Sequence, residues 1–547
     1  MMSSLYKDRT TADYTSSQLV PRPFRIAIVG CGPRGLQCLE VLSRRLTTAQ
    51  LNGLHVTIFE PTDTPGAGRV YDPAQSHVLK MNLATQYLDF WRTDSDDRTC
   101  RSESMVGWLS RHHPDMAMSD QYVPRAIVGK YLYDCFTTVW DYLKQHASVQ
   151  WKQTTVQDLC QADHSWIIND GLDSERFDHV VVTTGHEGIR ASAISNSASE
   201  PFVFPVERQL SRERVLPGSM VFLRGFGLTA IDAILMLTEG RGGKFVECPH
   251  LPAYIKSLDE PRRIDIYSRS GRPMLAKPTA KMEPITSNFW QPFKSELGGK
   301  LSAHGHLRFQ EDIWRVVIKA AASLLNESGQ SVTAEQVHVW YESWSRCEMN
   351  LATARQAMIQ SYNVAIGSRP KDIPFALGEA WRKLYPEIVA LISHGGLTLE
   401  TWRCYQTMQR EMERIAFGPP ALNVGKLLAL MRSRIVRYCN LPAQSNQRIQ
   451  CDLYDVRLNA VLAAPHEFQS QGLLSNLIAA GVVQIEKMTN AIHIDRAGGV
   501  GPVASGLSVF GRATEGWVVG NDTLSRSLHD QIKNWAEIIT VELVKKI

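Results

Sequence analysis

The chain has 547 residues, of which 44% are hydrophobic and 21% charged, and its formal net charge is +4. This length favours two or three lobes over one compact core, and the composition is typical of a globular protein in water. A net charge this small for the length gives no reason to expect nucleic acid or an anionic membrane surface as a partner.

The ten cysteines are scattered and form no CxxC or Cys/His cluster, which predicts neither a metal site nor a disulfide framework. A reducing, cytoplasmic location is therefore expected. No apolar stretch approaches the roughly 18–20 residues that span a bilayer, so no membrane partner is predicted. Residues 1–23 are polar, rich in Ser and Thr, and lack an apolar core, so they are predicted to be a disordered leader.

The first folded segment has the pattern of a nucleotide-binding turn. An apolar run, Ile26 to Val29, predicts a buried parallel strand, and an apolar pattern at helical spacing follows the turn. Three glycines separate strand and helix and allow a tight turn, close approach to a pyrophosphate and packing of helix on strand. The N-terminus of such a helix offers N–H groups to phosphates. The predicted binding residues of this turn are Gly30, Gly32, Pro33, Arg34 and Gly35.

The next strand, Leu54 to Phe59, ends in Glu60, a carboxylate placed to bind ribose hydroxyl groups. A loop dense in Gly and Pro follows, and then the segment VLKMN. Together GCGPRGL, FEPTDTPGAGRVYD and VLKMN resemble the FAD/NAD(P)-binding domain family of flavoproteins, relatives of class B flavin monooxygenases and amino-acid N-hydroxylating enzymes. The resemblance implies that the loop and the VLKMN segment lie against FAD. The residues that it places there are Gly68, Arg69, Tyr71, Met81 and Asn82.

Segments near the end of the first lobe also resemble this flavoprotein family. Tyr122 to Arg125 is similar to the family's Arg-containing entry to a helix, although Arg125 could equally form a plain ion pair at a helix start. Val149 to Val156 and Ser165 to Ile168 predict short antiparallel strands, and the resemblance implies a backbone contact of Val156 with adenine. Val180 to Val182 predicts a buried strand. It ends in a turn, Thr184-Gly185, that resembles the Ala-Thr-Gly turn of two-nucleotide flavoproteins and is counted with the cofactor site.

A second nucleotide site is predicted after Ser219, again as strand, glycine turn and helix. Its turn contains Gly225, Gly227 and Thr229, and Ala230 stands at the third glycine position. The following strand ends in Ser268-Arg269-Ser270-Gly271-Arg272 rather than in an acid. An acid would repel a 2′-phosphate, whereas Arg pairs with it, so Ser268, Arg269 and Arg272 predict NADPH here. The alternative is that both arginines are solvated turn residues.

The pattern then changes to helices. Thr333 and Gln336 form a capping box. Basic residues of this region could bind a substrate carboxylate or lie on solvated helix faces: Arg410, Arg414, Arg432 and Arg434. The predicted helices span Phe309–Leu325, Leu351–Ile366, Gly378–Ile392, Leu399–Phe417 and Leu422–Tyr438.

The last part returns to short strands, Leu453–Val456, Val482–Ile485 and Ile492–Ile494, and a closing helix, Ser525–Val544. Between them, a strand with a glycine turn resembles the family's C-terminal return to the FAD lobe. The resemblance implies flavin contacts at Gly511 and Gly516.

The predicted fold is α/β, with two Rossmann-like dinucleotide-binding lobes and a large helical insert. The predicted divisions are the leader 1–23, an FAD lobe 24–200, an NADPH lobe 201–282, an insert 283–445 that walls the substrate pocket, and a return 446–547 to the FAD lobe. Oligomeric state stays open.

Two nucleotide sites imply that NADPH reduces FAD. In the resembled monooxygenases the reduced flavin then captures O2 as a C4a-peroxide that oxygenates a small substrate, and N-hydroxylation of an amine or amino acid is the first hypothesis. The F-x-G-x-x-x-H signature of ketone-oxidising members is missing between Thr184 and Gly225. The alternatives are an NADPH-dependent flavin oxidoreductase that inserts no oxygen and a non-catalytic FAD-binding redox sensor. No catalytic acid or base can be named.

Overall fold

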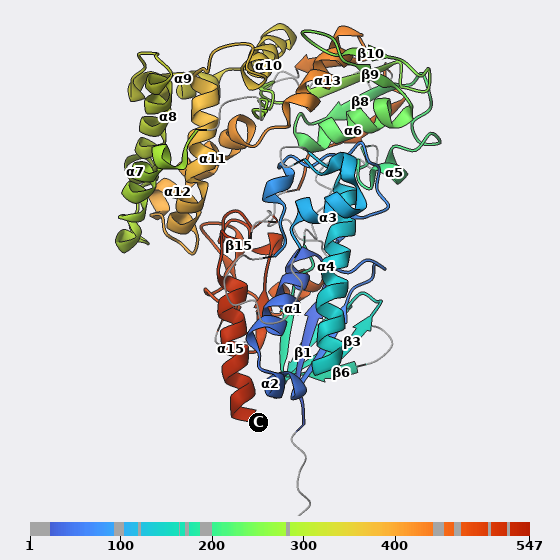
Figure 1. Ribbon diagram of the computed structural model, residues 1–547, viewed down its shortest axis with the longest axis vertical. Helices are drawn as coiled ribbons and strands as arrows, with labels where there is room; N and C mark the ends of the chain where they lie inside the picture. Colours follow the sequence, from blue (N-terminus) through green and yellow to red (C-terminus); the bar gives the residue numbers. More distant parts are fainter. Residues whose placement is uncertain are drawn as a thin grey trace, which may run out of the picture.

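The structure is a computed structural model. It describes residues 22–91, 103–118, 122–163, 165–169, 174–185, 200–279, 285–440, 453–463, 472–501, 505–521, 524 and 526–546. The predicted leader, 1–23, lies outside the described residues except for Arg22 and Pro23. Figure 1 shows three parts: a lower lobe that contains both ends of the described chain, an upper lobe around β8, and a set of helices beside it.

The lower lobe is built on a parallel sheet with the strand order β16-β7-β1-β2-β3. Because both faces of the sheet are covered, its central strands β1, β2 and β7 are mostly apolar, and all their residues are buried except Arg25 and His55, which are partly exposed. One face packs on α1, α4 and α15, and the other packs on a three-stranded antiparallel sheet, β4-β5-β6. The bounds are β1 Phe24–Val29, β2 Leu54–Phe59, β3 Ser148–Lys152, β4 Asp158–Ala162, β5 Ser165–Asn169, β6 Ser174–Phe177, β7 His179–Val182, β16 Leu507–Val509, α1 Pro33–Arg45, α4 Arg125–His146 and α15 Gln531–Lys546.

The upper lobe has its own parallel sheet, ordered β12-β11-β8-β13. Counted along the chain within each lobe, both sheets begin with the Rossmann order 3-2-1-4. The prediction of two Rossmann-like lobes is confirmed. The elements are β8 Met220–Arg224, β11 Arg263–Ser268, β12 Val436–Asn440, β13 Val456–Asn459, α6 Leu228–Thr238 and α13 Ala421–Arg432.

Three predicted elements are corrected by these sheets. The strand predicted within Val149–Val156 is not antiparallel, because β3 pairs in parallel with β2 at the edge of the main sheet. The helix predicted over Leu422–Tyr438 ends at Arg432, and the apolar residues beyond it form β12 of the upper sheet. The strand predicted at Leu453–Val456 begins at Val456 and pairs with β8, so the chain returns to the lower lobe only after Asn459.

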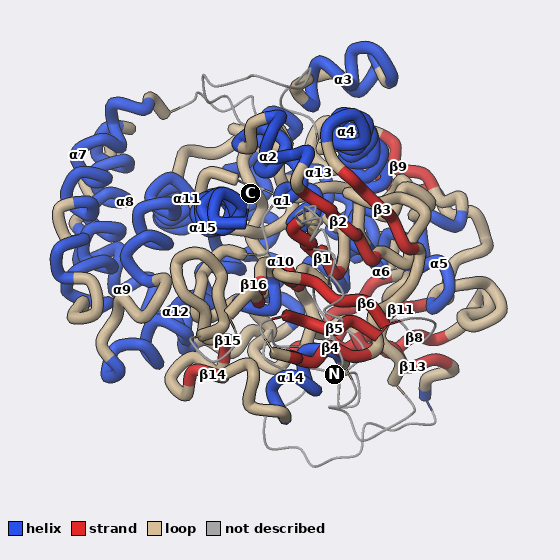
Figure 2. The backbone as a smooth tube through the Cα atoms, turned by 90° about the horizontal axis from the view of Figure 1, so that it is seen from below, coloured by secondary structure: helices blue, strands red, loops and turns tan. Residues whose placement is uncertain are grey.

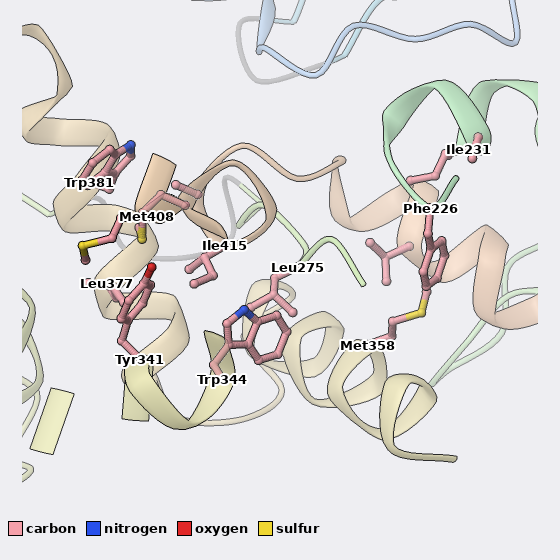
Figure 3. Close-up of a cluster of buried hydrophobic side chains, with 14 of the residues drawn as sticks. Phe226, Ile231, Leu275, Tyr341, Trp344, Met358, Leu377, Trp381, Met408 and Ile415 are labelled. Atoms are coloured by element: carbon pink, nitrogen blue, oxygen red, sulfur yellow. The ribbon is translucent and has the colours of Figure 1, made fainter. Parts of the chain in front are cut away.

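The helical part packs on the upper lobe. One continuous buried cluster joins its Trp381, Tyr341 and Met408 to Phe226 and Ile231 of the upper lobe (Figure 3). Seen from below, most of these helices gather on one side of the molecule and most strands lie on the other (Figure 2). The helices are α7 Ser287–Gly298, α8 Arg315–Glu327, α9 Ala334–Arg346, α10 Leu351–Ala365, α11 Ile373–Ile392 and α12 Leu399–Ala416, and a π-helical turn, Phe309–Trp314, precedes α8.

The capping box at Thr333 is confirmed, since its hydroxyl accepts from the Gln336 backbone N–H at the start of α9. The closing helix begins six residues later than predicted, at Gln531. The remaining helices and strands are short and lie in the connections: α2 Thr48–Asn52, α3 Met105–His112, α5 Val206–Gln209, α14 Leu473–Ala479, β9 Lys244–Val246, β10 Ala253–Ile255, β14 Ile485–Glu486 and β15 Ala491–Ile492.

Candidate functional site

The turn between β1 and α1 requires glycine for packing. Gly30 has φ +84°, and a Cβ there would lie 2.8 Å from the Thr183 carbonyl oxygen at the end of β7. A Cβ at Gly35 would lie 2.5 Å from the Gly30 carbonyl oxygen. Without side chains at these two positions, the helix can approach the strand closely. The turn lies between β1 and β7, where the strand order of the sheet reverses. Folds of this kind bind their ligands at that point.

The loop after β2 lies directly over this turn. The Gly66 N–H donates to the Cys31 carbonyl oxygen over 2.5 Å. A Cβ at Gly68 would lie 3.1 Å from the Gly32 Cα, so the two backbones meet without side chains between them. Arg69 and Tyr71 belong to the short 3-10 helix that follows, and Arg69 is exposed. The structure therefore brings both predicted glycine-rich segments to one place.

Glu60 lies against the same turn. It is 5% exposed, and its Oε2 accepts the Cys31 N–H over 2.7 Å. Its Oε1 accepts the N–H and hydroxyl of Thr62 over 3.0 and 2.9 Å. A carboxylate has about four lone-pair positions, so Glu60 can also accept a ribose hydroxyl here. Ribose binding stays a prediction.

The C-terminal segment reaches this site because β16 pairs with β7. A Cβ at Gly511, where φ is +88°, would lie 3.3 Å from Arg34 Cγ, which places this turn beside the start of α1. Gly185, three residues after β7, has φ +76°, and no atom of the described residues lies within 4 Å of its Cβ position. Gly516 instead packs against Ala491, with a Cβ distance of 3.2 Å, and Val156 is buried in the core beside the sheet.

These residues fit the adenosine diphosphate part of FAD. The N-cap of α1 is Gly32, whose position has no side-chain cap, and Pro33 follows it. The first N–H groups of the helix are thus available to phosphate oxygens, which the partial positive charge of the helix N-terminus favours. The first site would hold FAD through Gly32, Gly35 and Glu60.

The VLKMN segment pairs with the start of α4. The Met81 N–H donates to the Val123 carbonyl oxygen over 2.9 Å, and the Arg125 N–H donates to the Leu79 carbonyl oxygen over 2.8 Å. The Arg125 guanidinium reaches the other lobe and pairs with Asp232 of α6 over 2.6 Å. Of the two interpretations of Arg125, the structure supports an ion pair, and this pair joins the two lobes. Burial raises the pKa of Asp232, although the Arg125 charge opposes that shift.

The predicted second nucleotide site lies at the turn between β8 and α6. Gly225 has φ +111°, and a Cβ there would lie 3.2 Å from the Ala460 carbonyl oxygen. Gly227 is the N-cap of α6, and no atom of the described residues lies within 4 Å of its Cβ position, so there is space beside the backbone at the start of this helix. Thr229 is buried in the first turn of α6. The residues fit a phosphate group at Gly227.

The residues of the basic turn after β11 lie in two different environments. Ser268 ends β11 partly exposed, and Arg269 is exposed beyond it. Arg272 is turned away from the nucleotide site, since its guanidinium is buried in a bidentate ion pair with Glu411, with nitrogen–oxygen distances of 2.9 and 2.7 Å. It also donates to the Cys347 carbonyl oxygen. The prediction that Arg272 binds the 2′-phosphate is not supported by this geometry, because the insert occupies its hydrogen-bonding groups.

The four basic residues considered for substrate binding have different surroundings. Arg410 and Arg432 are exposed on α12 and α13, as expected of solvated helix faces, and Arg434 is exposed in the turn after α13. Arg414 donates to the Arg272 carbonyl oxygen and lies 3.7 Å from Glu411.

Sequence reasoning missed Lys277, which is 8% exposed and donates to the Asn82 carbonyl oxygen. A single lysine in an irregular segment has no periodic signal that could have identified it.

Residues 27–187 match the family model described as FAD-NAD(P)-binding. The segment is an FAD-NAD(P)-binding domain. This FAD-NAD(P)-binding domain covers β1 to β7 and contains the glycine turn, Glu60 and the VLKMN segment.

Two curated relatives extend the similarity beyond that domain. An L-aspartate N-monooxygenase (nitrosuccinate-forming) of Streptomyces davaonensis is 27% identical over 372 residues, which are 58% of this chain and 55% of that relative. The chain thus spans about half the length of this relative. A nitrosuccinic acid synthase of Aspergillus oryzae is 25% identical over 493 residues, 84% of this chain and 72% of that protein. Among solved structures, a cadaverine monooxygenase bound to FAD aligns with 96% of this chain at 10% identity, with a TM-score of 0.46.

Within the described residues there is no group of three or more His, Cys, Asp or Glu side chains that could hold a metal ion. Nor does any helix in this part of the chain have the length and apolar character required to cross a membrane.

Proposed function

We propose that the protein is an FAD- and NADPH-dependent monooxygenase that oxygenates the amine nitrogen of an amino acid, with L-aspartate as the substrate. The observation that carries this proposal is the presence of two strand–glycine–helix sites on separate parallel sheets of one chain, joined by the Arg125–Asp232 ion pair. The activities named for the two relatives supply the substrate class.

The chain's own residues have binding and positioning roles in this proposal. The lower lobe holds FAD at Gly32, Gly35, Glu60 and Gly511, and the upper lobe holds NADPH at Gly227 and Arg269. Bound FAD supplies hydride acceptance and activation of O2. One oxygenation consumes one O2 and one NADPH, places one oxygen atom on the amine nitrogen and releases the other as water. The protein orients the reactants and excludes bulk water.

The coenzyme preference depends on Arg269. Arg269→Ala is expected to raise the KM for NADPH by roughly 10- to 100-fold, the loss typical of a charge-assisted contact. The KM for NADH, which has no 2′-phosphate, stays within about twofold, because the contact contributes little to it. Arg262→Ala is the control, since Arg262 is also exposed but precedes β11 at its other end. Equal changes for both coenzymes would contradict the assignment.

The reaction itself is tested by measuring NADPH and O2 consumption of purified holoenzyme with L-aspartate and, as a control, L-asparagine. The expected result is aspartate-dependent consumption and a product that carries oxygen from 18O2, detected by mass spectrometry. Complete conversion of O2 to H2O2 with every amino acid would instead support the flavin oxidoreductase alternative. Failure of NADPH to reduce the bound flavin would support the redox sensor.

A further inference from the structure

Lys277 lies where the three parts of the molecule meet. It follows β11 of the upper lobe, and its segment bridges to Pro420 beside α13. Its ammonium group donates to the Asn82 carbonyl oxygen of the lower lobe, in the VLKMN segment. It also lies 5.9 Å from the centre of the Phe417 ring, at the end of α12. The side chain therefore touches the FAD-binding domain and the insert at once.

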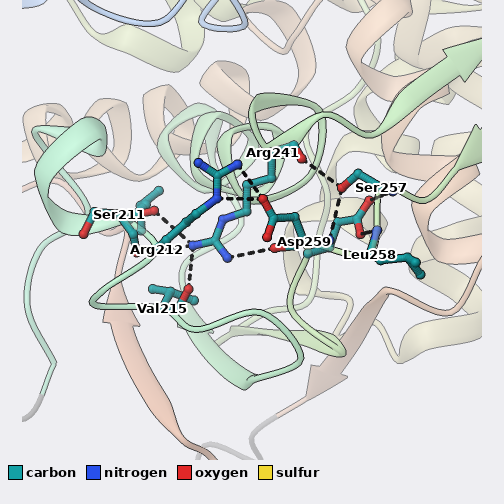
Figure 4. A network of polar contacts seen from close by, with 9 residues as sticks. Ser211, Arg212, Val215, Arg241, Ser257, Leu258 and Asp259 are labelled. Carbon is teal, nitrogen blue, oxygen red and sulfur yellow. Dashed lines mark hydrogen bonds and ion pairs between the residues drawn. The ribbon is translucent and has the colours of Figure 1, made fainter.

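The other buried cations of the described chain have their charge compensated. Arg272 pairs with Glu411, Arg526 with Glu40, and Lys426 with Glu239 over 2.6 Å. Arg241 is held by carbonyl oxygens instead, among them those of Val215 and Asp259 (Figure 4). Burying a charge is costly unless hydrogen bonds or an opposite charge compensate it, and these four residues follow that rule.

Lys277 departs from that pattern. Among the described residues, no carboxylate forms an ion pair with it, and the Asn82 carbonyl oxygen is its one hydrogen-bond acceptor. The acid that acts on it, Glu379, is already bonded to Arg382 of the same helix. An ammonium has three N–H donors, so two of them have no acceptor among the described residues. The described residues thus give this buried ammonium one hydrogen-bond acceptor and no paired carboxylate.

The pKa of Lys277 is consistent with a buried ammonium group that has no paired carboxylate. Burial, and after it the nearby Arg382 charge, lower the pKa of Lys277, while Glu379 opposes the shift, and the resulting pKa is about 7. A bound carboxylate would favour the ammonium form and reverse the shift.

We propose that the Lys277 ammonium group binds a carboxylate of the acidic amino-acid substrate. This inference rests on the proposed function and names the residue that selects the substrate class. The Asn82 carbonyl oxygen fixes the ammonium beside the segment expected to contact FAD and leaves two N–H groups for the carboxylate. The upper lobe thus contributes a substrate contact as well as the NADPH site.

The test compares Lys277→Met with Lys426→Met. Both residues are buried lysines beside a phenylalanine ring, but Lys426 has Glu239 as its partner. Binding of L-aspartate and of succinate, a dicarboxylate without an amine, is measured by calorimetry on the holoenzyme. Lys277→Met is expected to weaken both by roughly 10- to 100-fold, as for other lost hydrogen bonds to charged groups. Lys426→Met is expected to leave both affinities within about twofold, and Lys277→Arg to recover part of the loss.

A second measurement applies if Lys277→Met does not fold. Succinate affinity of the unaltered enzyme should fall between about pH 7 and pH 9, as the lysine loses its proton. Affinity unchanged over this range, or unchanged in Lys277→Met, overturns the inference, and so does a wild-type enzyme that binds neither ligand.

The experiments distinguish a failure of the proposed function from a failure of the proposed role of Lys277. If aspartate is oxygenated by both the wild type and Lys277→Met with the same KM, the proposed function stands and the role of Lys277 is wrong. If succinate binding depends on Lys277 while no amino acid is oxygenated, the carboxylate site stands and the proposed reaction is wrong.

Discussion

Gly35 and Gly32 have different requirements although they belong to one motif. A Cβ at Gly35 would lie 2.5 Å from the Gly30 carbonyl oxygen, which no side chain can accommodate without moving the helix. A Cβ at Gly32 would lie 3.5 Å from the Gly68 Cα, an ordinary contact. Packing therefore requires glycine at position 35, whereas at position 32 the proposed cofactor requires it.

Gly32→Val is expected to yield folded protein that has lost its flavin, because the added methyl groups occupy the space where the pyrophosphate would approach the backbone. The measurement is the visible absorbance of the purified protein together with its thermal unfolding. Gly298→Val is the control, since no atom lies within 4 Å of that Cβ position. A yellow Gly32→Val protein would show that FAD is not bound at this turn.

Lys277 also predicts a pH dependence of stability. Its folded pKa is about 7, below the value of about 10.4 in the unfolded chain. Between these values the unfolded state binds more protons, so the unfolding free energy contributed by Lys277 rises with pH, by at most about 1.4 kcal/mol per unit. Urea unfolding of wild type and Lys277→Met from pH 7 to pH 9 should show this rise only in the wild type. Parallel pH curves for the two proteins would contradict the shifted pKa.

At the scale of elements, the contact between α4 and α6 joins the two lobes through Arg125 and Asp232. Neither helix pattern alone indicates it, because the partners are 107 residues apart. Arg125 compensates the negative charge of the Asp232 carboxylate, which is buried with 4% exposed.

Arg125→Met should lower the unfolding free energy by about 3–5 kcal/mol at pH 7, because it leaves Asp232 buried without its partner. The pKa of Asp232 then rises further, so the variant should lose less at pH 5, where protonation relieves the buried charge. Urea unfolding at both pH values provides the measurement. The double variant Arg125→Met/Asp232→Leu should recover part of the loss, and a loss below about 0.5 kcal/mol would mean that the pair is unimportant.

At the scale of the whole molecule, the buried core is divided unevenly. The upper lobe and the insert share one cluster, whereas the two faces of the lower sheet have separate clusters. The insert was predicted as a separate part, but packing joins it to the upper lobe. We therefore expect these two parts to unfold together.

Trp381→Ala tests this expectation. Trp381 is fully buried in α11, and its removal should cost about 3–5 kcal/mol. Hydrogen exchange should then accelerate in β8 and β11 as well as in the insert, while β1 and β7 stay protected. Trp535→Ala, in α15 of the lower lobe, should give the opposite pattern. Faster exchange confined to the insert would contradict a shared unfolding unit.

The sequence alone located the two strand–glycine turn–helix segments that begin the two sheets, because strand, turn and helix are adjacent in the chain and each glycine acts on its near neighbours. It also indicated that Glu60 ends the second strand, that a glycine-rich loop follows it, and where most helices of the insert lie. Only the tertiary structure assigned β12 and β13 to the upper sheet, since an apolar run of a few residues is compatible with a helix or a strand until its neighbours are known. It likewise decided that Arg272 pairs with Glu411 and that Lys277 meets Asn82. Those contacts join residues more than a hundred positions apart, and burial and charge compensation become visible only when the chain is folded.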